Sequence, residues 1–117
     1  MLRSEIRMVE LDPTRGSEAN KRRPAVIVSN DGMNTTAARL GRGGITVIPL
    51  TSNTVHVYPF QVLLDSTACG LQTTSKAQAE QLRSVDIGRV GVLVGHVPDS
   101  LMTKINAALR LHLALDD

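Results

Sequence analysis

Aromatic residues and cysteine are scarce in this chain of 117 residues. It has no tryptophan, and Tyr58, Phe60 and Cys69 are the single representatives of their types. Two aromatic residues argue against a broad base-stacking platform of the kind that general single-strand binders use. A lone cysteine cannot form a disulfide within the chain, which fits a reducing compartment. Its neighbours Ala68 and Gly70 predict a loop position for it, without a nucleophilic role.

Long apolar runs and a strong net charge are also absent. No stretch approaches the roughly 20 apolar residues that a membrane span needs, and the charged amino terminus lacks the apolar segment of a secretion signal. We therefore expect a cytoplasmic protein with no membrane contact. The formal net charge is +2, so only a local patch of positive charge would attract nucleic acid. The length fits one domain, residues 1–117.

Charged and turn-forming residues concentrate in residues 11–30. Proline, glycine and asparagine interrupt this stretch, which predicts a loop that runs directly into an apolar strand at residues 25–28. Pro24 restricts its own φ and favours an extended Arg23, so this guanidinium can leave the chain in few directions. The same loop carries the carboxylate of Glu18. An acid and a permanently charged guanidinium on one loop indicate chemistry on phosphate.

Short β-type segments separated by turn residues dominate the rest of the chain. They are expected at residues 5–11, 25–29, 44–50, 60–64 and 76–85. Their number and spacing predict a small barrel or a strongly curved sheet.

Two helices are expected beside these strands. The first covers residues 34–40 and precedes a glycine cluster at 41–44, which we interpret as a plain loop because no nucleotide-binding unit surrounds it. The second begins at Pro98, which is suited to the first helical position, with Asp99 in the first turn. Its apolar stripe at helical spacing consists of Leu101, Ile105, Ala108, Leu109 and His112. This stripe predicts an amphipathic C-terminal helix in which His112 is partly buried.

Several short motifs follow one another in a fixed order along the chain. They are Asp12-Pro13, Gly16-Ser17-Glu18, Arg23-Pro24, Pro49-Leu50-Thr51-Ser52-Asn53, Tyr58-Pro59-Phe60-Gln61-Val62 and Gln81-Leu82-Arg83-Ser84-Val85-Asp86. Each motif alone is weak, but the ordered set is specific and spans nearly the whole chain. The sequence resembles the MazF/PemK (Kid) family of toxin endoribonucleases. It departs from the family pattern near the start, where Arg7 replaces an aromatic residue.

The resemblance implies a mainly β fold with a C-terminal helix, the SH3-like small barrel of CcdB and PemK toxins. It also implies sequence-specific cleavage of single-stranded RNA, without a metal or other cofactor, that arrests translation. The RNA would be mRNA, with tRNA and rRNA left open, and DNA is not expected as a substrate. Arg23 and Thr51 match the family's principal catalytic pair.

Self-cleavage of RNA requires deprotonation of a 2′-hydroxyl, stabilisation of a phosphorane-like transition state and protonation of the departing 5′-oxygen. The donor fork of Arg23 matches non-bridging phosphate oxygens, and the Thr51 hydroxyl can orient the phosphate or the 2′-oxygen. Glu18 acts as a base, orients the guanidinium or forms a surface ion pair of little consequence, and these roles remain open. From composition alone, Arg23 would be a solvated loop residue and Thr51 an ordinary strand end.

Nine further residues are candidates for RNA binding. They are Ser17, Asn20, Lys21, Arg22, Ser52, Asn53, His56, Gln78 and Glu80. Some family members carry a histidine in place of Ser17 and an arginine in place of Gln78, and the acid–base roles of those residues do not transfer here. Glu80 stands where the family also has an acidic residue. It is a second candidate for the base, or a group that recognises an exocyclic amine of the RNA. His96 is expected near a loop without metal-ligand spacing, so no metal site is predicted.

The resemblance also implies a homodimer whose two basic loops face one groove. A cognate antitoxin with an acidic, disordered segment would cover Arg23 in that groove. Independent support comes from the C-terminal segment, whose apolar residues cover more of the helix than one small sheet can bury. These residues are Leu101, Met102, Leu111, Leu113 and Leu115.

Two other functions remain open. A toxin of the same fold can trap DNA gyrase without enzymatic activity, as the CcdB proteins do through a C terminus that contains tryptophan. This chain has no tryptophan and ends Leu115-Asp116-Asp117. A non-catalytic RNA-binding barrel would keep the basic loop but would need no particular arginine and threonine.

Overall fold

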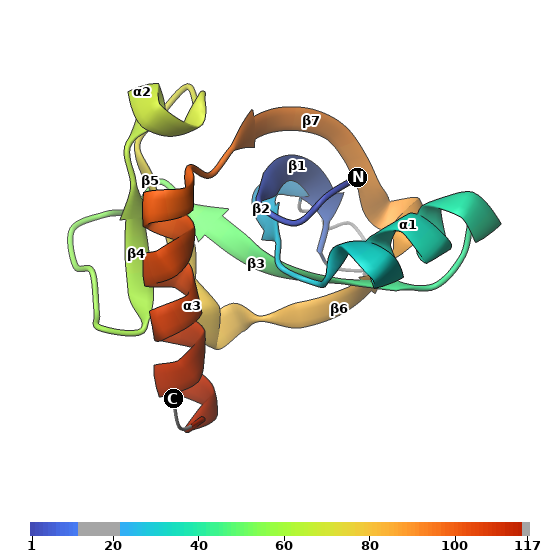
Figure 1. The fold of residues 1–117 in the computed structure, drawn as a ribbon. Helices are drawn as coiled ribbons and strands as arrows, with labels where there is room; N and C mark the ends of the chain where they lie inside the picture. The colour runs from blue at the N-terminus through green and yellow to red at the C-terminus, as the bar shows by residue number, and fades with distance from the viewer. Residues whose placement is uncertain (12–21, 116–117) are drawn as a thin grey trace, which may run out of the picture.

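The computed structural model describes residues 1–11 and 22–115. Antiparallel strands and two longer helices make up the fold (Figure 1). In chain order the elements are β1 (Glu5–Glu10), β2 (Arg22–Ile27), α1 (Asp31–Leu40), β3 (Gly44–Thr51), β4 (Gln61–Leu64), α2 (Ser66–Cys69), β5 (Ser75–Gln78), the 3₁₀ turn η1 (Ala79–Gln81), β6 (Arg83–Asp86), the 3₁₀ turn η2 (Ile87–Arg89), β7 (Val90–His96) and α3 (Asp99–Leu113). The predicted class, mainly β with a C-terminal helix, is confirmed.

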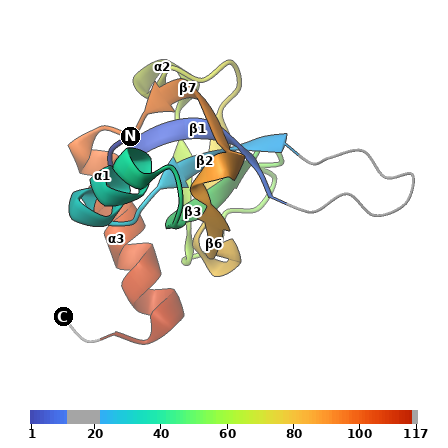
Figure 2. The same ribbon diagram turned by 90° about the vertical axis from the view of Figure 1, so that its right-hand side faces the viewer.

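β3 is the central strand of the sheet. One of its edges pairs with β2, while the other pairs with β6 near the start of β3 and with β5 at its end, always antiparallel. The strand order is β4-β5-β3-β2-β1-β7, with β6 off this path. β7 arches over β1, so the sheet curves into a small, barrel-like shape (Figures 1 and 2). Because β3 is paired along both edges, it holds the strands on either side in register.

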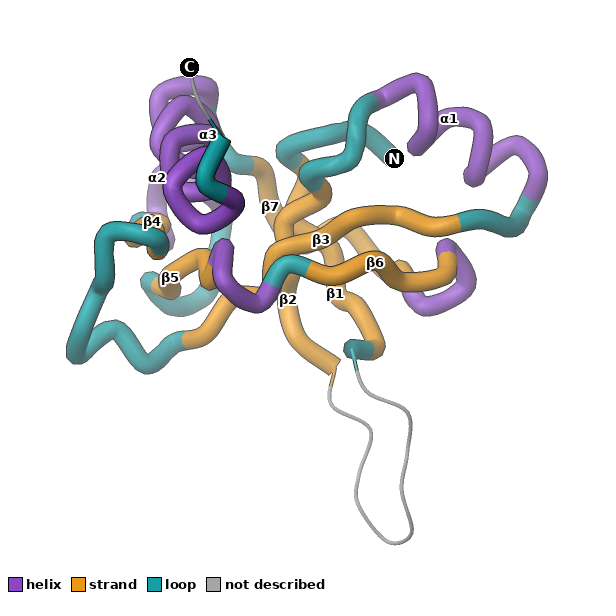
Figure 3. The backbone as a smooth tube through the Cα atoms, turned by 90° about the horizontal axis from the view of Figure 1, so that it is seen from below, coloured by secondary structure: helices purple, strands orange, loops and turns teal. Residues whose placement is uncertain are grey.

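Two apolar clusters fill the interior, one toward each end of β3. The helices α3 and α1 lie apart from each other, toward these two ends (Figure 3). The first cluster lies beneath α3 and includes the fully buried Ile48, Leu64 and Ile105. The second lies beneath α1 and includes Ile45 and Ala37. Burying one large aliphatic side chain contributes about 1.5–3 kcal/mol. The two clusters therefore anchor β3 between two helices, and with it the strand ends that form the site described below.

Capping residues set the helix ends. α1 begins three residues before the predicted start because the side chain of Asn30 accepts a hydrogen bond from the N–H of Met33 over 2.8 Å. It ends at Gly41, whose φ of 69° is easily adopted only by glycine. The glycine cluster at 41–44 joins α1 to β3, as predicted. Pro98 is the N-cap of α3 rather than its first helical residue, so the helix begins at Asp99.

One prediction about α3 is wrong. His112 is exposed and not partly buried, because the last turn of α3 extends past the sheet (Figure 1). The earlier turns follow the predicted stripe at Ile105 and Ala108, which are buried. Met102, predicted to be one of the apolar residues that the sheet leaves uncovered, is also buried, and Leu101 packs against the same cluster. Within the described residues, no helix has the length and apolar character needed to cross a membrane.

The second half of the chain contains more elements than predicted. The stretch expected at residues 76–85 is two strands, β5 and β6, separated by η1. β7 was not predicted, because it contains two glycines and lacks the alternation of buried and exposed residues that marks a strand in sequence. One of these glycines is required by packing, since any side chain at Gly95 would collide with the carbonyl oxygen of Cys69.

The predicted loop position of Cys69 is also wrong, because this residue ends the short helix α2. The N–H of Ala68 donates to the carboxylate of Asp65 over 3.0 Å and caps the helix, which ends at Gly70. The side chain of Cys69 is 1% exposed and belongs to the cluster beneath α3. Burial, together with the nearby charge of Asp65, raises the pKa of its thiol. Cys69 therefore packs as a small apolar side chain.

Candidate functional site

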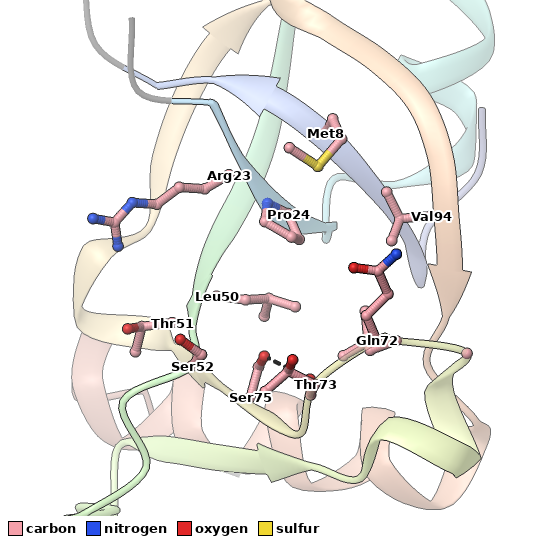
Figure 4. A pocket seen from close by; sticks show the side chains of 12 residues that line it. Met8, Arg23, Pro24, Leu50, Thr51, Ser52, Gln72, Thr73, Ser75 and Val94 are labelled. Atoms are coloured by element: carbon pink, nitrogen blue, oxygen red, sulfur yellow. Dashed lines mark hydrogen bonds between the residues drawn. The ribbon is translucent and has the colours of Figure 1, made fainter. Parts of the chain in front are cut away.

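A cavity of about 740 Å³ opens where β2 and β3 separate (Figure 4). Its walls come from the ends of these two strands, from the connection between α2 and β5, and from β1 and β7. The polar residues that line it are Arg23, Thr51, Ser52, Gln72, Thr73 and Ser75, and the apolar ones are Met8, Pro24, Leu50, Leu71 and Val94. The cavity thus offers a cation, hydroxyl groups and a carboxamide around an apolar surface.

Arg23 and Thr51 come together because β2 and β3 pair in register. Ala25 pairs with Pro49, and this register, continued by two residues, brings Arg23 and Thr51 to the same end of the cavity, which both line. The backbone ladder between the two strands stops before this point, at Ala25 and Pro49, while the opposite edge of β3 pairs with β5 at Leu50 and Thr51. Pro24, which has no N–H to donate, stands at the position where the ladder ends. The two side chains are therefore held by paired strands, yet lie where the strands separate.

The hydroxyl of Thr51 is oriented by its own chain. The N–H of Asn53 donates to Thr51 Oγ1 over 3.3 Å, and the N–H of Val55 donates to Asn53 Oδ1 over 3.3 Å. Side-chain turns of this kind fix the chain just after a strand. Because Thr51 Oγ1 accepts this hydrogen bond, its own proton remains available for a ligand. Ser52 lines the same end of the cavity.

The guanidinium of Arg23 is exposed, and no described residue forms a hydrogen bond or an ion pair with it. It lies at the same end of the cavity as Thr51 and Ser52 (Figure 4). A guanidinium stays charged near neutral pH and presents a planar fork of donors to a phosphate group. With two hydroxyl groups beside it, this end of the cavity can bind a phosphate and stabilise additional negative charge on it.

Three polar residues of the cavity were missed by sequence reasoning: Gln72, Thr73 and Ser75. Gln72 and Thr73 lie on the connection between α2 and β5, Ser75 is the first residue of β5, and no local motif marks them. Ser75 Oγ donates to the carbonyl oxygen of Thr73 over 3.0 Å (Figure 4). Only the pairing of β5 with β3 brings this connection to Thr51.

Comparison with known sequences identifies the family. The family model described as "PemK-like, MazF-like toxin of type II toxin-antitoxin system" matches residues 2–113. The chain belongs to the MazF/PemK family. The endoribonuclease MazF9 of Mycobacterium tuberculosis is 57% identical over 115 residues, which are 98% of this chain and 98% of the relative. The endoribonuclease PemK of Escherichia coli is 35% identical over 108 residues, 90% of this chain and 76% of the relative. The predicted family is thus confirmed.

Solved structures of MazF-type toxins share the fold. An endoribonuclease from a mycobacterial species, determined in complex with its cognate antitoxin, is 25% identical, with a TM-score of 0.77 over 100% of this chain and 98% of its own. A MazE–MazF structure from Deinococcus radiodurans has a TM-score of 0.79 at 23% identity, over 99% of this chain and 97% of its own. At that identity the likeness shows the fold alone. The predicted small-barrel toxin fold is confirmed.

Other predicted site residues of this MazF/PemK chain lie outside the cavity. Arg22 precedes Arg23 in β2 and points elsewhere, since neighbouring strand residues face opposite sides of a sheet. Its Nη2 atom is 3.4 Å from the place that a Cβ of Gly91 would occupy in β7. The positive charge of Arg22 therefore lies over β7.

The scarce aromatic residues of the chain lie together on the connection between β3 and β4. The rings of Tyr58 and Phe60 stack with centroids 5.5 Å apart and an angle of 6° between their planes, and His56 lies 6.2 Å from Tyr58. Lys76 Nζ is 5.8 Å from the centre of the Tyr58 ring and donates to the carbonyl oxygen of His56 over 2.6 Å. Lys76 is also the ladder partner of Thr51. The partly exposed stack thus stands beside the strand end that carries Thr51.

Glu80 and Gln78 contact Gln61, the residue that follows this connection. Gln61 Nε2 donates to Glu80 Oε2 over 2.7 Å, and the N–H of Tyr58 donates to Gln61 Oε1 over 3.2 Å. The second carboxylate oxygen, Oε1, is buried and has no hydrogen-bond partner among the described residues. Gln78 pairs with Gln61 across β4 and β5. Neither Glu80 nor Gln78 lines the cavity that holds Arg23.

Four predicted residues, Ser17, Glu18, Asn20 and Lys21, lie outside the described residues. In the ranges 1–11 and 22–115, no group of three or more histidine, cysteine, aspartate or glutamate side chains is arranged to hold a metal ion.

Proposed function

We propose that this MazF/PemK-family toxin is a sequence-specific endoribonuclease that cleaves single-stranded RNA in the cytoplasm and arrests translation. The observation that carries the proposal is the cavity that Arg23 and Thr51 both line at the diverging ends of β2 and β3. The names of its relatives, endoribonucleases MazF9 and PemK among them, point to the same activity. They favour RNA cleavage over the gyrase-trapping alternative.

In the proposed reaction the 2′-hydroxyl of the substrate attacks the adjacent phosphorus. The bond from phosphorus to the 5′-oxygen breaks, which leaves a 2′,3′-cyclic phosphate and a 5′-hydroxyl end. Arg23 stabilises the charge that develops on the non-bridging oxygens, because its donor fork matches their geometry. Thr51 donates its free hydroxyl proton to the phosphate or the attacking oxygen. None of these steps needs a metal ion, since the nucleophile belongs to the substrate.

Proton transfer needs a base for the 2′-hydroxyl and an acid for the leaving 5′-oxygen. We propose Glu18 as the base or as the group that orients the Arg23 guanidinium. Glu80 is less suited to act on the same phosphate, because its carboxylate binds Gln61 and does not line the cavity. Its position supports a role in holding the connection between β3 and β4.

The RNA on either side of the scissile phosphate would follow the polar residues that border the cavity. Ser52 and Asn53 continue from Thr51, and His56 belongs to the partly exposed aromatic stack on the same connection. Arg22 adds positive charge over β7. With Ser17, Asn20, Lys21 and Gln78, these residues are the proposed RNA contacts. An overall charge of only +2 makes such local contacts necessary for binding.

A cleavage experiment tests the proposal. The purified chain is incubated with a long RNA of defined sequence in excess chelator, and the 5′ ends of the products are mapped. We expect cuts at a few recurring sequences with 5′-hydroxyl ends, and no cut where the nucleotide before the scissile phosphate lacks its 2′-hydroxyl. Loss of cleavage in chelator that Mg²⁺ restores would refute this mechanism. Binding without cleavage would instead support the non-catalytic barrel.

We further propose that the toxin acts as a homodimer. Leu111, Leu113 and Leu115 at the end of α3 are 57%, 46% and 58% exposed, an apolar surface that a second subunit can cover. In β7, Val92 and Leu93 are also exposed. We expect sedimentation of a dimer at micromolar concentration, and a monomer there would contradict this assembly.

A cognate antitoxin is the proposed inhibitor, as in the mycobacterial complex of similar fold. The exposed guanidinium of Arg23 suits an acidic, disordered segment that folds on binding and competes with RNA. Its affinity should fall as salt rises, because surface charges are screened. An inhibitor that leaves RNA binding intact would count against this arrangement.

A further inference from the structure

The cavity has two chemically different ends (Figure 4). Arg23, Thr51 and Ser52 stand together at one end, as described above. Gln72 stands at the other end, beside Val94 of β7. Met8, Pro24 and Leu50 form the apolar surface between them. Thr73 and Ser75 lie between Gln72 and Ser52 (Figure 4). A phosphate suits the first end, because Arg23, the one cation among the described residues that line the cavity, stands there.

The carboxamide of Gln72 is exposed, and no described residue forms a hydrogen bond with it. The residues on either side of Gln72, in contrast, are tied to the start of α2 by hydrogen bonds. The N–H of Leu71 donates to the carbonyl oxygen of Ser66 over 2.9 Å, and the N–H of Ser66 donates to Thr74 Oγ1 over 3.0 Å. The chain therefore presents one unused carboxamide from a fixed turn, at the edge of an apolar surface.

A nucleobase has the matching chemistry, since its faces are apolar and its edge carries donors and acceptors side by side. We propose that the Gln72 end of the cavity binds the base of a nucleotide next to the scissile phosphate, and that Gln72 recognises the edge of this base. The inference rests on the proposed function, because Arg23 and Thr51 must hold the phosphate for the base to reach Gln72. It goes beyond that function by assigning a base subsite and the residue that gives it specificity.

Glutamine offers one donor and one acceptor, which together form two hydrogen bonds with a base edge that presents the same pair, such as N6 and N7 of adenine. Replacing the carboxamide by groups of nearly the same shape should change base preference and leave catalysis in place. Gln72→Met keeps the length of the side chain but removes both polar atoms. Gln72→Glu keeps the shape but has acceptors only, so it favours the N1–H and N2–H₂ donors of guanine.

The experiment measures cleavage by the full chain on an RNA pool randomised around its mapped cleavage sequence, with products sequenced for each variant. For Gln72→Met we expect base preference to fall by about 5- to 100-fold at one position beside the cut, with preference at other positions unchanged. For Gln72→Glu, we expect the same position to shift toward guanine. The carboxylate also repels RNA phosphates, so this variant is judged by ratios between sequences and not by its total rate.

Gln81→Met is the matched control, because Gln81 is exposed and lies outside the cavity. The Gln81→Met variant should leave the base preference unchanged at every position around the cut. A rate loss for Gln72→Met that is equal at all sequences would overturn the inference, as would an unchanged preference. If the natural chain cuts no RNA, the proposed function fails separately. Binding of four homopolymeric RNAs then tests the subsite alone: Gln72→Met should alter their order of affinity, and an unaltered order would refute it.

Discussion

The middles and the ends of β2 and β3 differ sharply in what they contact. In the middle, Val26 and Ile48 are ladder partners that are fully buried beneath α3. Three residues away on each strand, Arg23 and Thr51 lie beyond the shared ladder and line an open cavity. The same two strands therefore supply both a fully buried part of the core and the polar residues of the candidate site.

This difference shows how a small domain can hold an exposed arginine at a fixed place beside a cavity. Burial of the strand middles fixes the direction in which the chain leaves the sheet, and the register sets which residues face each other at the ends. The polar side chains at the ends are accessible because the two strands separate there and leave a cavity between them. We thus expect substitutions in the middles to change stability and substitutions at the ends to change activity.

The largest effect is expected in the strand middle. Ile48→Ala removes a fully buried side chain and should lower the free energy of unfolding by about 2–5 kcal/mol, from lost burial and the cavity that remains. Urea unfolding measures the loss, and Ile48→Val, expected to cost about 0.5–1.5 kcal/mol, is the control. At a temperature where the variant is folded, its cleavage rate should be nearly normal. A folded Ile48→Ala protein without activity would contradict the expectation that the strand middles determine stability and not activity.

At the strand end, Arg23→Ala should lower the cleavage rate by about 100- to 1,000-fold, because one preorganised donor to the transition state is lost. Its midpoint of unfolding should stay close to that of the natural chain, since the side chain is exposed. Arg23→Lys should also be a poor enzyme, because a point charge does not reproduce the planar fork. Single-turnover rates measure both variants. Near-normal cleavage by Arg23→Ala would remove this residue from the proposed mechanism.

A smaller effect is expected beyond the end of β3. Tyr58→Ala removes the ring between His56 and Phe60 and should raise KM about tenfold with little change in kcat, if RNA bases use the stack. Tyr58→Phe keeps the ring and should behave like the natural chain. Val55→Ala, at an 81% exposed position on the same connection, controls for general loop effects. An unchanged KM for Tyr58→Ala would show that the stack serves stability only.

The smallest effect concerns pH and the buried region. Because burial raises the pKa of the Cys69 thiol in the folded state, the unfolded chain loses this proton first as pH rises. The stability that Cys69 contributes is complete below the thiol's unfolded pKa and declines as pH rises through the folded pKa. The measurement is urea unfolding of the natural chain and of Cys69→Ala, with a reductant, at pH 7.5 and at pH 10. The difference in their free energies of unfolding should be smaller at pH 10 than at pH 7.5. Parallel pH profiles would contradict a raised pKa.

Local signals explain which elements were predictable. α1 and α3 were found because helical spacing and turn residues act within a few positions. β7 was missed because Gly95 weakens a strand signal, and the reason for this glycine is the carbonyl group of Cys69, far away in the chain. His112 fitted the helical stripe but is exposed, because spacing along a helix does not reveal where the sheet beneath it ends.

In the candidate site, too, some features follow from local sequence and others from contacts between distant segments. The sequence by itself determined that Arg23 would stand beside Pro24 next to an apolar strand and that Thr51 would end another strand, because these preferences come from neighbouring residues. The predicted loop position of Arg23 is wrong, because β2 begins at Arg22 and Arg23 pairs with Val9 of β1. Only the tertiary structure decided that the two side chains line the same end of one cavity, since that depends on the register between β2 and β3. It alone also placed Gln72 across the cavity from them and turned Arg22 toward β7. Contacts between segments distant in sequence are set by packing of the whole chain, which no local pattern encodes.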